Sequence, residues 1–295
     1  MAERFSSLAG LPHRHGDCYS AGVKHPLAIL HANCQGEPLA RALLASPEFR
    51  RAYAPRVFLN YTREELPQSA LNACGLFLYQ HLGPQWGGLA SDALLRRLPS
   101  GCPSLCIPNM FFRGPWPLWS GAPGFDFRDT YLDRLLDMDL PAQDILRVYL
   151  GPGLARHFDL DALLAETVAM ERERQARTPV PYLDHVLEHF RKRPLFLTVN
   201  HPSSELIILA AQGILRELGL APAEERELSA FTTGYEDFFL PIHPQAAAHY
   251  GLAYGGAEAR YPVYGRERSF TEYAAAYVAC RQAGVDDFIG FLKAA

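Results

Sequence analysis

The feature that most constrains this chain is a short apolar run followed by a polar turn and a leucine-rich segment, over residues 26–48. The run 27–30 predicts a buried strand. Gly36 marks a turn, Pro38 stands where a helix can begin, and the leucines that follow predict an apolar helical stripe. The tripeptide Asn33-Cys34-Gln35 is therefore expected in a strand-to-helix turn.

A turn of this kind brings polar side chains to the carboxyl end of a sheet. There the free N–H groups of a helix N-terminus favour a thiolate or an oxyanion. Asn33 and Gln35 flank the thiol of Cys34 with amides, which are costly to bury without partners. A lone cysteine after a strand also fits a small buried hydrophobe, so both interpretations of Cys34 stay open.

A second polar turn, Asn200-His201-Pro202-Ser203, follows the apolar run 195–199, which also predicts a strand. A cysteine in one such turn and a histidine in another is the arrangement that a thiol–imidazole pair requires, because the two must be adjacent in space and not in sequence. His201 also fits a helix-start residue that is bonded to backbone.

Short apolar runs and helical patterns alternate between residues 26 and 112. Such alternation predicts a parallel sheet flanked by helices, and ligands bind such sheets outside the carboxyl ends of the strands. Gln80, His81 and Asn109 fall at those ends. The expected fold class is α/β, with a small parallel helix-flanked sheet in the N-terminal part and a largely helical remainder. The expected strands are 27–32, 55–60, 76–82 and 104–108, and the expected helices here are 38–52 and 89–98.

The organisation expected for the whole chain is an irregular arm over residues 1–25 and one domain over 26–295. That domain divides into an α/β part (26–112) and a mainly helical part (113–295). The aromatic, proline-rich loop 113–124 fits a pocket wall and a surface connection equally well. Residues 229–268 are rich in Gly, Tyr and Pro and are expected to be loop-like. Further helices are expected at 161–177, 182–193, 203–218, 270–281 and 286–294.

Several of these motifs occur together, in the same order, in a known family. The chain resembles the WcbI-type family of capsular-polysaccharide biosynthesis proteins, proposed acetyltransferases that bind coenzyme A. Where that family usually has glycine before Asn-Cys-Gln, this chain has Ala32. The segments that carry the resemblance are Asn33-Cys34-Gln35, 76–81, 105–112, Val199-Asn200-His201-Pro202, 240–244 and 270–273.

The resemblance implies a soluble enzyme that moves an acyl group, such as the acetyl of acetyl-CoA, to a sugar hydroxyl. Acyl transfer requires a nucleophile or base, donors for an oxyanion and a site for the phosphates of coenzyme A. Cys34 and His201 are the expected catalytic residues, by a covalent or a direct route. Oxyanion or substrate contacts are expected from Asn33, Gln35, Gln80, His81, Asn109, Asn200 and Ser203, and phosphate contacts from Arg113 and Arg266, although each arginine also fits an ordinary solvated one.

Two other classes of function stay open. The first is a non-catalytic subunit of a capsule assembly system that binds sugars or nucleotides, since tyrosine- and tryptophan-rich loops suit sugar stacking. The second is a cysteine-dependent esterase. Thermal stabilisation by coenzyme A favours the transferase, whereas acid release without coenzyme A favours the esterase.

Composition narrows the remaining possibilities. The formal net charge of −4 argues against a general nucleic-acid-binding surface. No apolar run approaches the ~20 residues of a membrane span, and the N-terminus lacks the form of a signal peptide, so a cytoplasmic location is expected. The spacing of the six cysteines matches no zinc template, and His185 and His189, one helical turn apart, suit a solvated helix face better than a metal site. We therefore expect no metal; the oligomeric state is not indicated.

Overall fold

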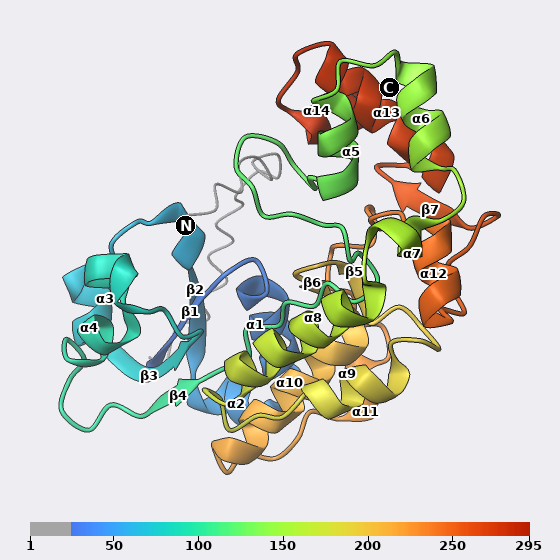
Figure 1. The fold of residues 1–295 in the computed structure, drawn as a ribbon. Coiled ribbons are helices and arrows are strands. Elements are labelled where there is room, and N and C mark those ends of the chain that lie inside the picture. Colours follow the sequence, from blue (N-terminus) through green and yellow to red (C-terminus); the bar gives the residue numbers. More distant parts are fainter. Residues whose placement is uncertain (1–24) are drawn as a thin grey trace.

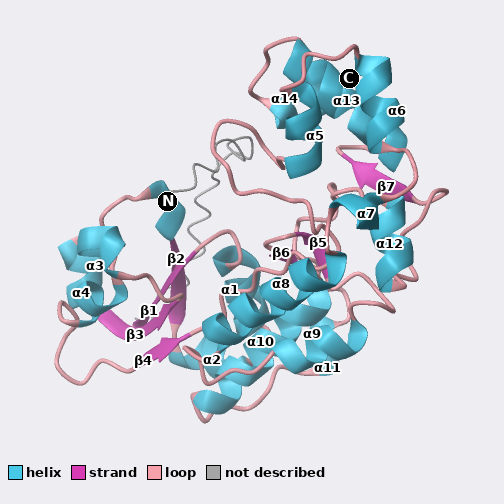
Figure 2. Cartoon of the chain, in the orientation of Figure 1, coloured by secondary structure: helices cyan, strands magenta, loops and turns pink. Residues whose placement is uncertain are grey.

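The computed structural model describes residues 25–295, so the expected arm over residues 1–25 lies outside the described chain except for its last residue. Figures 1 and 2 show a small sheet with short helices beside it, a central group of helices, and a group near the C-terminus that contains α5, α6, α13 and α14. In chain order the elements are β1 Leu27–Ala32, α1 Gly36–Leu44, α2 Pro47–Ala52, β2 Ala54–Leu59, η1 Asn60–Thr62, α3 Gln68–Asn72, β3 Cys74–Tyr79, η2 Pro84–Leu89, α4 Ser91–Leu95, β4 Ser104–Cys106, α5 Thr130–Leu136, α6 Ala142–Tyr149, α7 Leu154–His157, α8 Leu160–Gln175, α9 Leu183–His189, β5 Phe196–Thr198, β6 His201–Pro202, α10 Ser204–Glu217, α11 Glu225–Leu228, α12 Pro244–Tyr250, β7 Arg260–Val263, β8 Arg266–Ser269, α13 Phe270–Gln282 and α14 Phe288–Ala294.

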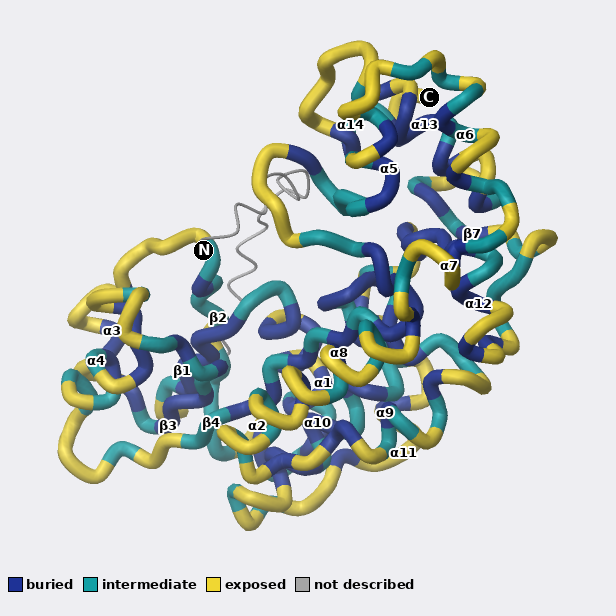
Figure 3. The backbone as a smooth tube through the Cα atoms, in the orientation of Figure 1, coloured by how far each residue is buried: buried dark blue, intermediate teal, exposed yellow. Residues whose placement is uncertain are grey.

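The sheet that positions the candidate site has four parallel strands in the order β2-β1-β3-β4. In register, Leu27 of β1 lies opposite Ala54 of β2, and Phe77 of β3 lies opposite Ser104 of β4. The two central strands are almost wholly buried, as expected for apolar runs in a parallel sheet (Figure 3). The α/β prediction, with the sheet in the N-terminal part and helices through most of the remainder, is confirmed.

Alternate residues of the central strands enter two different cores, because successive side chains of a strand point to opposite faces. On one face, Leu30 and Leu78 join the large core that contains the apolar sides of α1 and α10. On the other face, Ile29 and Phe77 pack in a smaller core with apolar residues of α3 and α4. The sheet is therefore covered on both sides, and its polar edge is the carboxyl end.

The helix expected over 38–52 is two helices in the structure. The side chain of Ser46 accepts a hydrogen bond from the backbone N–H of Phe49, and Pro47 is the first helical residue. A serine cap followed by proline starts a new helix, so α1 stops at Leu44 and α2 begins at Pro47.

The strand expected over 195–199 is present as β5. It lies outside the parallel sheet and forms a small antiparallel pair with β6, because the chain reverses at Val199 and Asn200. Residues 229–268 are not wholly loop-like, since they contain α12, β7 and the start of β8. Tyr264 and Gly265 both have positive φ, 51° and 82°, as a two-residue hairpin turn requires.

Within residues 25–295, no helix has both the length and the apolar character that crossing a membrane requires.

Candidate active site

Cys34 lies in the turn between β1 and α1, at the carboxyl end of the sheet. The side chain of Asn33 accepts the backbone N–H of Gln35 at 2.9 Å and so fixes the turn. Gly36 is required directly after it, because a Cβ there would lie 2.9 Å from a methyl group of Val57 and 3.0 Å from the Cβ of Ala32. Because glycine has no side chain there, the start of α1 packs closely against β2. This packing holds the thiol at the N-terminus of the nine-residue helix.

Buried amides support this turn from below. The side-chain oxygen of Gln80 accepts the backbone N–H of Asn33 at 2.8 Å, and its Nε2 donates to the oxygens of Gln35 and Pro108. Gln35 Nε2 donates to the carbonyls of Met110 and Asn200, at 2.7 and 2.9 Å. These two glutamines join the turn to the segment after β4 and to the β5–β6 turn.

The same bonds limit what Gln35 does chemically. Its two side-chain protons are given to backbone carbonyls and its backbone N–H to Asn33, so it has no free proton for an oxyanion. The expected oxyanion role of Gln35 therefore needs correction to a structural one, because the turn that brings Asn200 beside Cys34 uses those donors.

Three asparagines, Asn33, Asn109 and Asn200, add further amides at the thiol turn. Asn33 Nδ2 donates to Asn109 Oδ1 at 3.2 Å. Asn200 Oδ1 accepts the hydroxyl of Thr198 at 3.1 Å, and its Nδ2 lies 3.7 Å from the sulfur of Cys34. Asn200 thus directs an amide donor at the thiol.

Cys34 and His201 are brought together through a residue that the sequence pattern did not indicate, Tyr235. Its hydroxyl donates to the carbonyl of Cys34 at 2.6 Å. Its ring is stacked on the His201 ring, with 4.3 Å between centroids and an angle of 14° between the planes. Both predicted catalytic residues therefore contact Tyr235, and their catalytic roles stay a prediction. Tyr235 lies in the segment expected to be loop-like, where no motif distinguishes it from other tyrosines.

Burial governs the protonation of both groups. It raises the pKa of the Cys34 thiol from 9.0 to about 12, although hydrogen bonding from Tyr235 and from the turn backbone acts in the opposite direction. Burial lowers the pKa of His201 from 6.5 to about 4. At pH 7 the site therefore holds a neutral thiol and a neutral imidazole. For the thiol, burial outweighs the helix N-terminus, so a resting thiolate is not formed.

Glu205, the acid nearest to His201 in the sequence, is engaged elsewhere. One carboxylate oxygen lies 2.5 Å from Nε2 of His185, and both bind the guanidinium of Arg193 at 2.6 and 2.8 Å. Ser203 begins α10, and its buried hydroxyl has no partner among the described residues. His185 is therefore engaged by Glu205, whereas His189 lies 3.7 Å from a carboxylate oxygen of Glu188; within residues 25–295 no group of three His, Cys, Asp or Glu side chains could hold a metal ion.

The remaining predicted residues lie outside these contacts. His81 follows β3 beside Cys106, with its pKa lowered by burial. Arg113 pairs with Glu166 of α8 at 3.4 Å, and Arg266 of β8 donates to the carbonyl of the C-terminal residue. In the described chain, none of the three forms a hydrogen bond or ion pair with Cys34 or His201.

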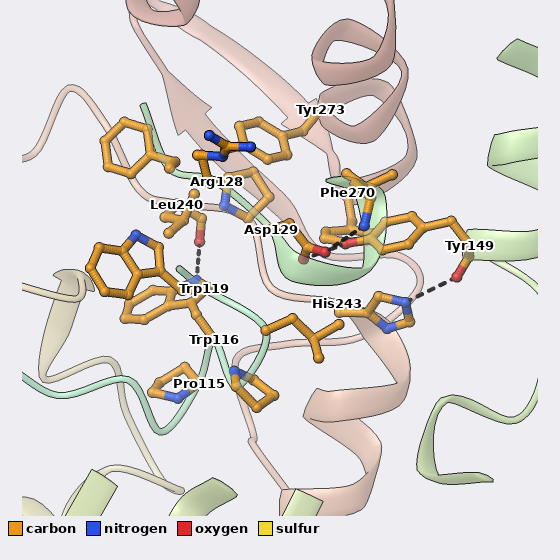
Figure 4. A pocket seen from close by; sticks show the side chains of 15 residues that line it. Pro115, Trp116, Trp119, Arg128, Asp129, Tyr149, Leu240, His243, Phe270 and Tyr273 are labelled. Carbon is orange, nitrogen blue, oxygen red and sulfur yellow. Dashed lines mark hydrogen bonds between the residues drawn. The ribbon is translucent and has the colours of Figure 1, made fainter. Parts of the chain in front are cut away.

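A separate aromatic pocket lies between the loop 113–124 and the start of α13 (Figure 4). Trp116 is buried there and donates from its indole N–H to the carbonyl of Leu240 at 2.8 Å. Its walls include His243 and Tyr273, from the 240–244 and 270–273 segments. The loop is therefore a pocket wall, but none of the residues expected at the Cys34 site lines this pocket.

The fold and the site define an α/β protein with Cys34 at the carboxyl end of a parallel sheet and with Tyr235 in contact with both Cys34 and His201. The model of the polysaccharide biosynthesis enzyme WcbI family matches residues 27–223, and the chain belongs to this family. A solved structure of WcbI, described as a novel polysaccharide biosynthesis enzyme, is similar with a TM-score of 0.71 and 18% sequence identity, over 92% of this chain and 93% of that chain. No curated protein sequence matches this chain.

Proposed function

We propose that this protein transfers an acyl group, such as acetyl, from coenzyme A to the hydroxyl of a sugar during polysaccharide biosynthesis. The observation that carries the proposal is that Cys34, at the carboxyl end of the sheet, and the neutral imidazole of His201 both contact the same side chain, Tyr235. An imidazole that is neutral at pH 7 has a free nitrogen lone pair, which a general base for a hydroxyl requires, although the lowered pKa of His201 makes it a weaker base than an exposed histidine.

Coenzyme A enters the proposal from a relative. The similar WcbI structure is described as native protein without a disulfide bond between coenzyme A and one of its cysteines. Cys34 fits the thiol end of such a ligand, and Asn200 directs an amide at the Cys34 sulfur. Ser203, two residues beyond His201, has a buried hydroxyl with no partner in the described chain, so it is free to bind a ligand. For the phosphates, Arg113 is the nearer of the two expected arginines in sequence to the site segment 108–112, and it would have to exchange Glu166 for the ligand.

The proposed reaction needs only groups that the site contains. The acyl donor supplies a thioester carbonyl. His201 takes the proton of the sugar hydroxyl while the hydroxyl oxygen bonds to the acyl carbon. The carbon–sulfur bond of the donor breaks, and His201 returns the proton to the departing sulfur. The donor that we assign to the oxyanion is the side-chain amide of Asn200, which is directed at the Cys34 sulfur.

A covalent route would instead use Cys34 as the nucleophile, with His201 taking the thiol proton first. The raised pKa of Cys34 makes this step dependent on His201, because the thiol is not ionised at pH 7. We favour the direct route for this reason.

The test measures binding and transfer with matched variants. Calorimetry with coenzyme A is expected to show binding, and labelled acetyl-CoA is expected to label one member of a panel of free and nucleotide-linked pyranoses. His201→Ala is expected to lower the transfer rate by about 10²- to 10⁴-fold, the usual contribution of a positioned base. If the direct route operates, Cys34→Ser should keep most of the transfer rate. If the covalent route operates, Cys34→Ser should lose most of that rate.

Cys106→Ala is the control, because Cys106 is also a partly buried thiol at a strand end but lies in β4. It should keep full activity. No binding of coenzyme A at millimolar concentration would remove the transferase proposal. Release of acid from acylated sugars without coenzyme A would assign an esterase, and sugar binding without either reaction would assign a binding subunit.

A further inference from the structure

The carbonyl of Cys34 lies just before the N-cap of α1, Gln35, and has no partner in that helix. At the start of a helix, the carbonyl of one residue accepts the N–H of the residue four positions later. For Cys34 that residue is Pro38, which has no N–H. The hydroxyl of Tyr235 takes the place of the missing donor, at 2.6 Å and from 201 positions away in the chain.

The loop that carries Tyr235 is built as a clip, which we define as residues 231–236. Arg41 of α1 donates to the carbonyls of Thr232 and Thr233, at 3.0 and 2.8 Å. The carboxylate of Glu236 accepts the backbone N–H and the hydroxyl of Thr233 and the N–H of Gly234. The clip is thus anchored to the same helix that begins at the cysteine turn, and the backbone N–H groups of Thr233 and Gly234 are satisfied within it.

The second contact of Tyr235 concerns the imidazole. Parallel rings at 4.3 Å restrict the plane of His201, and no hydrogen bond to its ring contributes to its lowered pKa, which desolvation alone causes within residues 25–295. In nucleophile–base sites a third group usually orients the base through a hydrogen bond. Here the nearest acid in sequence, Glu205, is held by His185 and Arg193, so it does not serve.

We propose that Tyr235 is the positioning residue of this site: its hydroxyl fixes the Cys34 turn, and its ring fixes the plane of the His201 imidazole in place of a carboxylate. The inference rests on the proposed roles of Cys34 and His201, but its readouts require no donor or acceptor. The titratable and charged groups around the pair are Arg41 and Glu37 of α1 and Tyr61 of η1.

The first readout is the titration of the His201 ring, followed by NMR in the full-length protein. The wild-type ring is expected to titrate near pH 4, because it is desolvated. Tyr235→Leu removes the stacked ring, so solvent reaches the imidazole and its titration should move up by at least about one pH unit, toward the ordinary 6.5. Tyr235→Phe keeps the ring and should leave the titration within about half a unit of wild type.

The second readout is alkylation of Cys34 by iodoacetamide, quantified by mass spectrometry at fixed pH. Tyr235→Phe removes only the hydroxyl, which releases the turn and should expose the thiol, so we expect alkylation about fivefold faster. Tyr254→Phe is the matched control, because the Tyr254 hydroxyl also donates to a backbone carbonyl, that of Phe190, at 2.7 Å. It should change neither readout.

Arg41→Met provides a variant in which Tyr235 itself is unchanged. It removes the two bonds that anchor the clip and should move both readouts in the same directions by smaller amounts, even if Tyr235→Leu fails to fold. A His201 titration that is the same in wild type, Tyr235→Leu and Arg41→Met overturns the orienting role. Alkylation in Tyr235→Phe equal to that in Tyr254→Phe overturns the role of the hydroxyl. Loss of coenzyme A binding or transfer alone leaves both readouts intact and counts only against the proposed function.

Discussion

Replacing Gln35 by leucine tests whether the buried amides hold the site together. Gln35 is 1% exposed and makes four hydrogen bonds through its side chain. Leucine has a similar volume and no polar atom, so Gln35→Leu removes the bonds with little change in packing. The substitution leaves two carbonyls, the N–H of Met110 and one proton of Gln80 without their present partner.

The magnitude follows from the cost of a buried polar group that loses its partner, about 1–3 kcal/mol each. Because some of the four groups can relax toward one another or toward water, we expect Gln35→Leu to lower the free energy of unfolding by about 4 kcal/mol. Natural domains have only about 5–15 kcal/mol in total, so the loss should be plain in urea denaturation followed by circular dichroism.

Gln35→Glu adds a prediction about pH. An ionised glutamate would place one oxygen against the carbonyls of Met110 and Asn200, so burial and these carbonyls should raise its folded-state pKa above the unfolded value. The stability conferred by the protonated form is then present at low pH and lost as the pH rises through the folded-state pKa. The free energy of unfolding of Gln35→Glu should therefore move closer to that of wild type as the pH is lowered from 8 to 5.

The control is Gln282→Leu, because the exposed Gln282 makes a single hydrogen bond, to the carbonyl of Leu140 at 3.0 Å. Its loss should stay below about 0.5 kcal/mol, as for surface substitutions in general. A Gln35→Leu variant that matches this control, or a Gln35→Glu deficit that grows as the pH falls, would refute the reasoning.

Three further predictions concern stability. Burial lowers the pKa of His31 from 6.5 to about 4, so the contribution of His31 to the free energy of unfolding is complete above pH 6.5 and falls by about 2 kcal/mol at pH 5. In urea titrations at several pH values, His31→Phe should therefore show a smaller loss of stability between pH 6.5 and pH 4 than wild type. An equal loss in both proteins would count against the assignment. Gly36→Ala should cost about 1–3 kcal/mol by crowding Val57, with part of the loss recovered in the Gly36→Ala/Val57→Ala double variant. Trp116→Phe should lower the free energy of unfolding by about 2 kcal/mol, because it leaves the buried carbonyl of Leu240 unpaired. Trp119→Phe should cost less, because the Trp119 indole makes no hydrogen bond in the described chain. Equal shifts of the melting temperature in the two variants would contradict the assigned bond.

The parallel sheet and the position of Cys34 follow from local signals. The apolar runs at β1 and β3, the turn at 33–36 and the leucines of α1 all lie within short windows, so periodicity identifies them. The break between α1 and α2 also has a local signal, the cap residue Ser46 followed by Pro47. The apolar stripe continues across this break, so periodicity alone predicts one helix.

The rest of the site depends on contacts between distant segments. Nothing near Gln35 in sequence reveals that its side chain will be used by Met110 and Asn200, because both partners are backbone atoms that any residue provides. No sequence pattern identifies Tyr235 either, because its partners are a backbone carbonyl and an aromatic ring in distant segments. The β5 run looks like the other strands, and only tertiary pairing decides that it forms a small antiparallel pair with β6.

The absence of an N–H at Pro38 also sets an order of events during synthesis. Tyr235, the donor that replaces it, lies 201 positions after Cys34 and beyond residue 223, where the match to the family model ends. At about 5–20 residues per second, a ribosome needs roughly 10–40 s to add that length of chain. Through this interval the cysteine turn exists without its hydroxyl partner, so the nascent chain can hold a formed sheet while its thiol site is still incomplete.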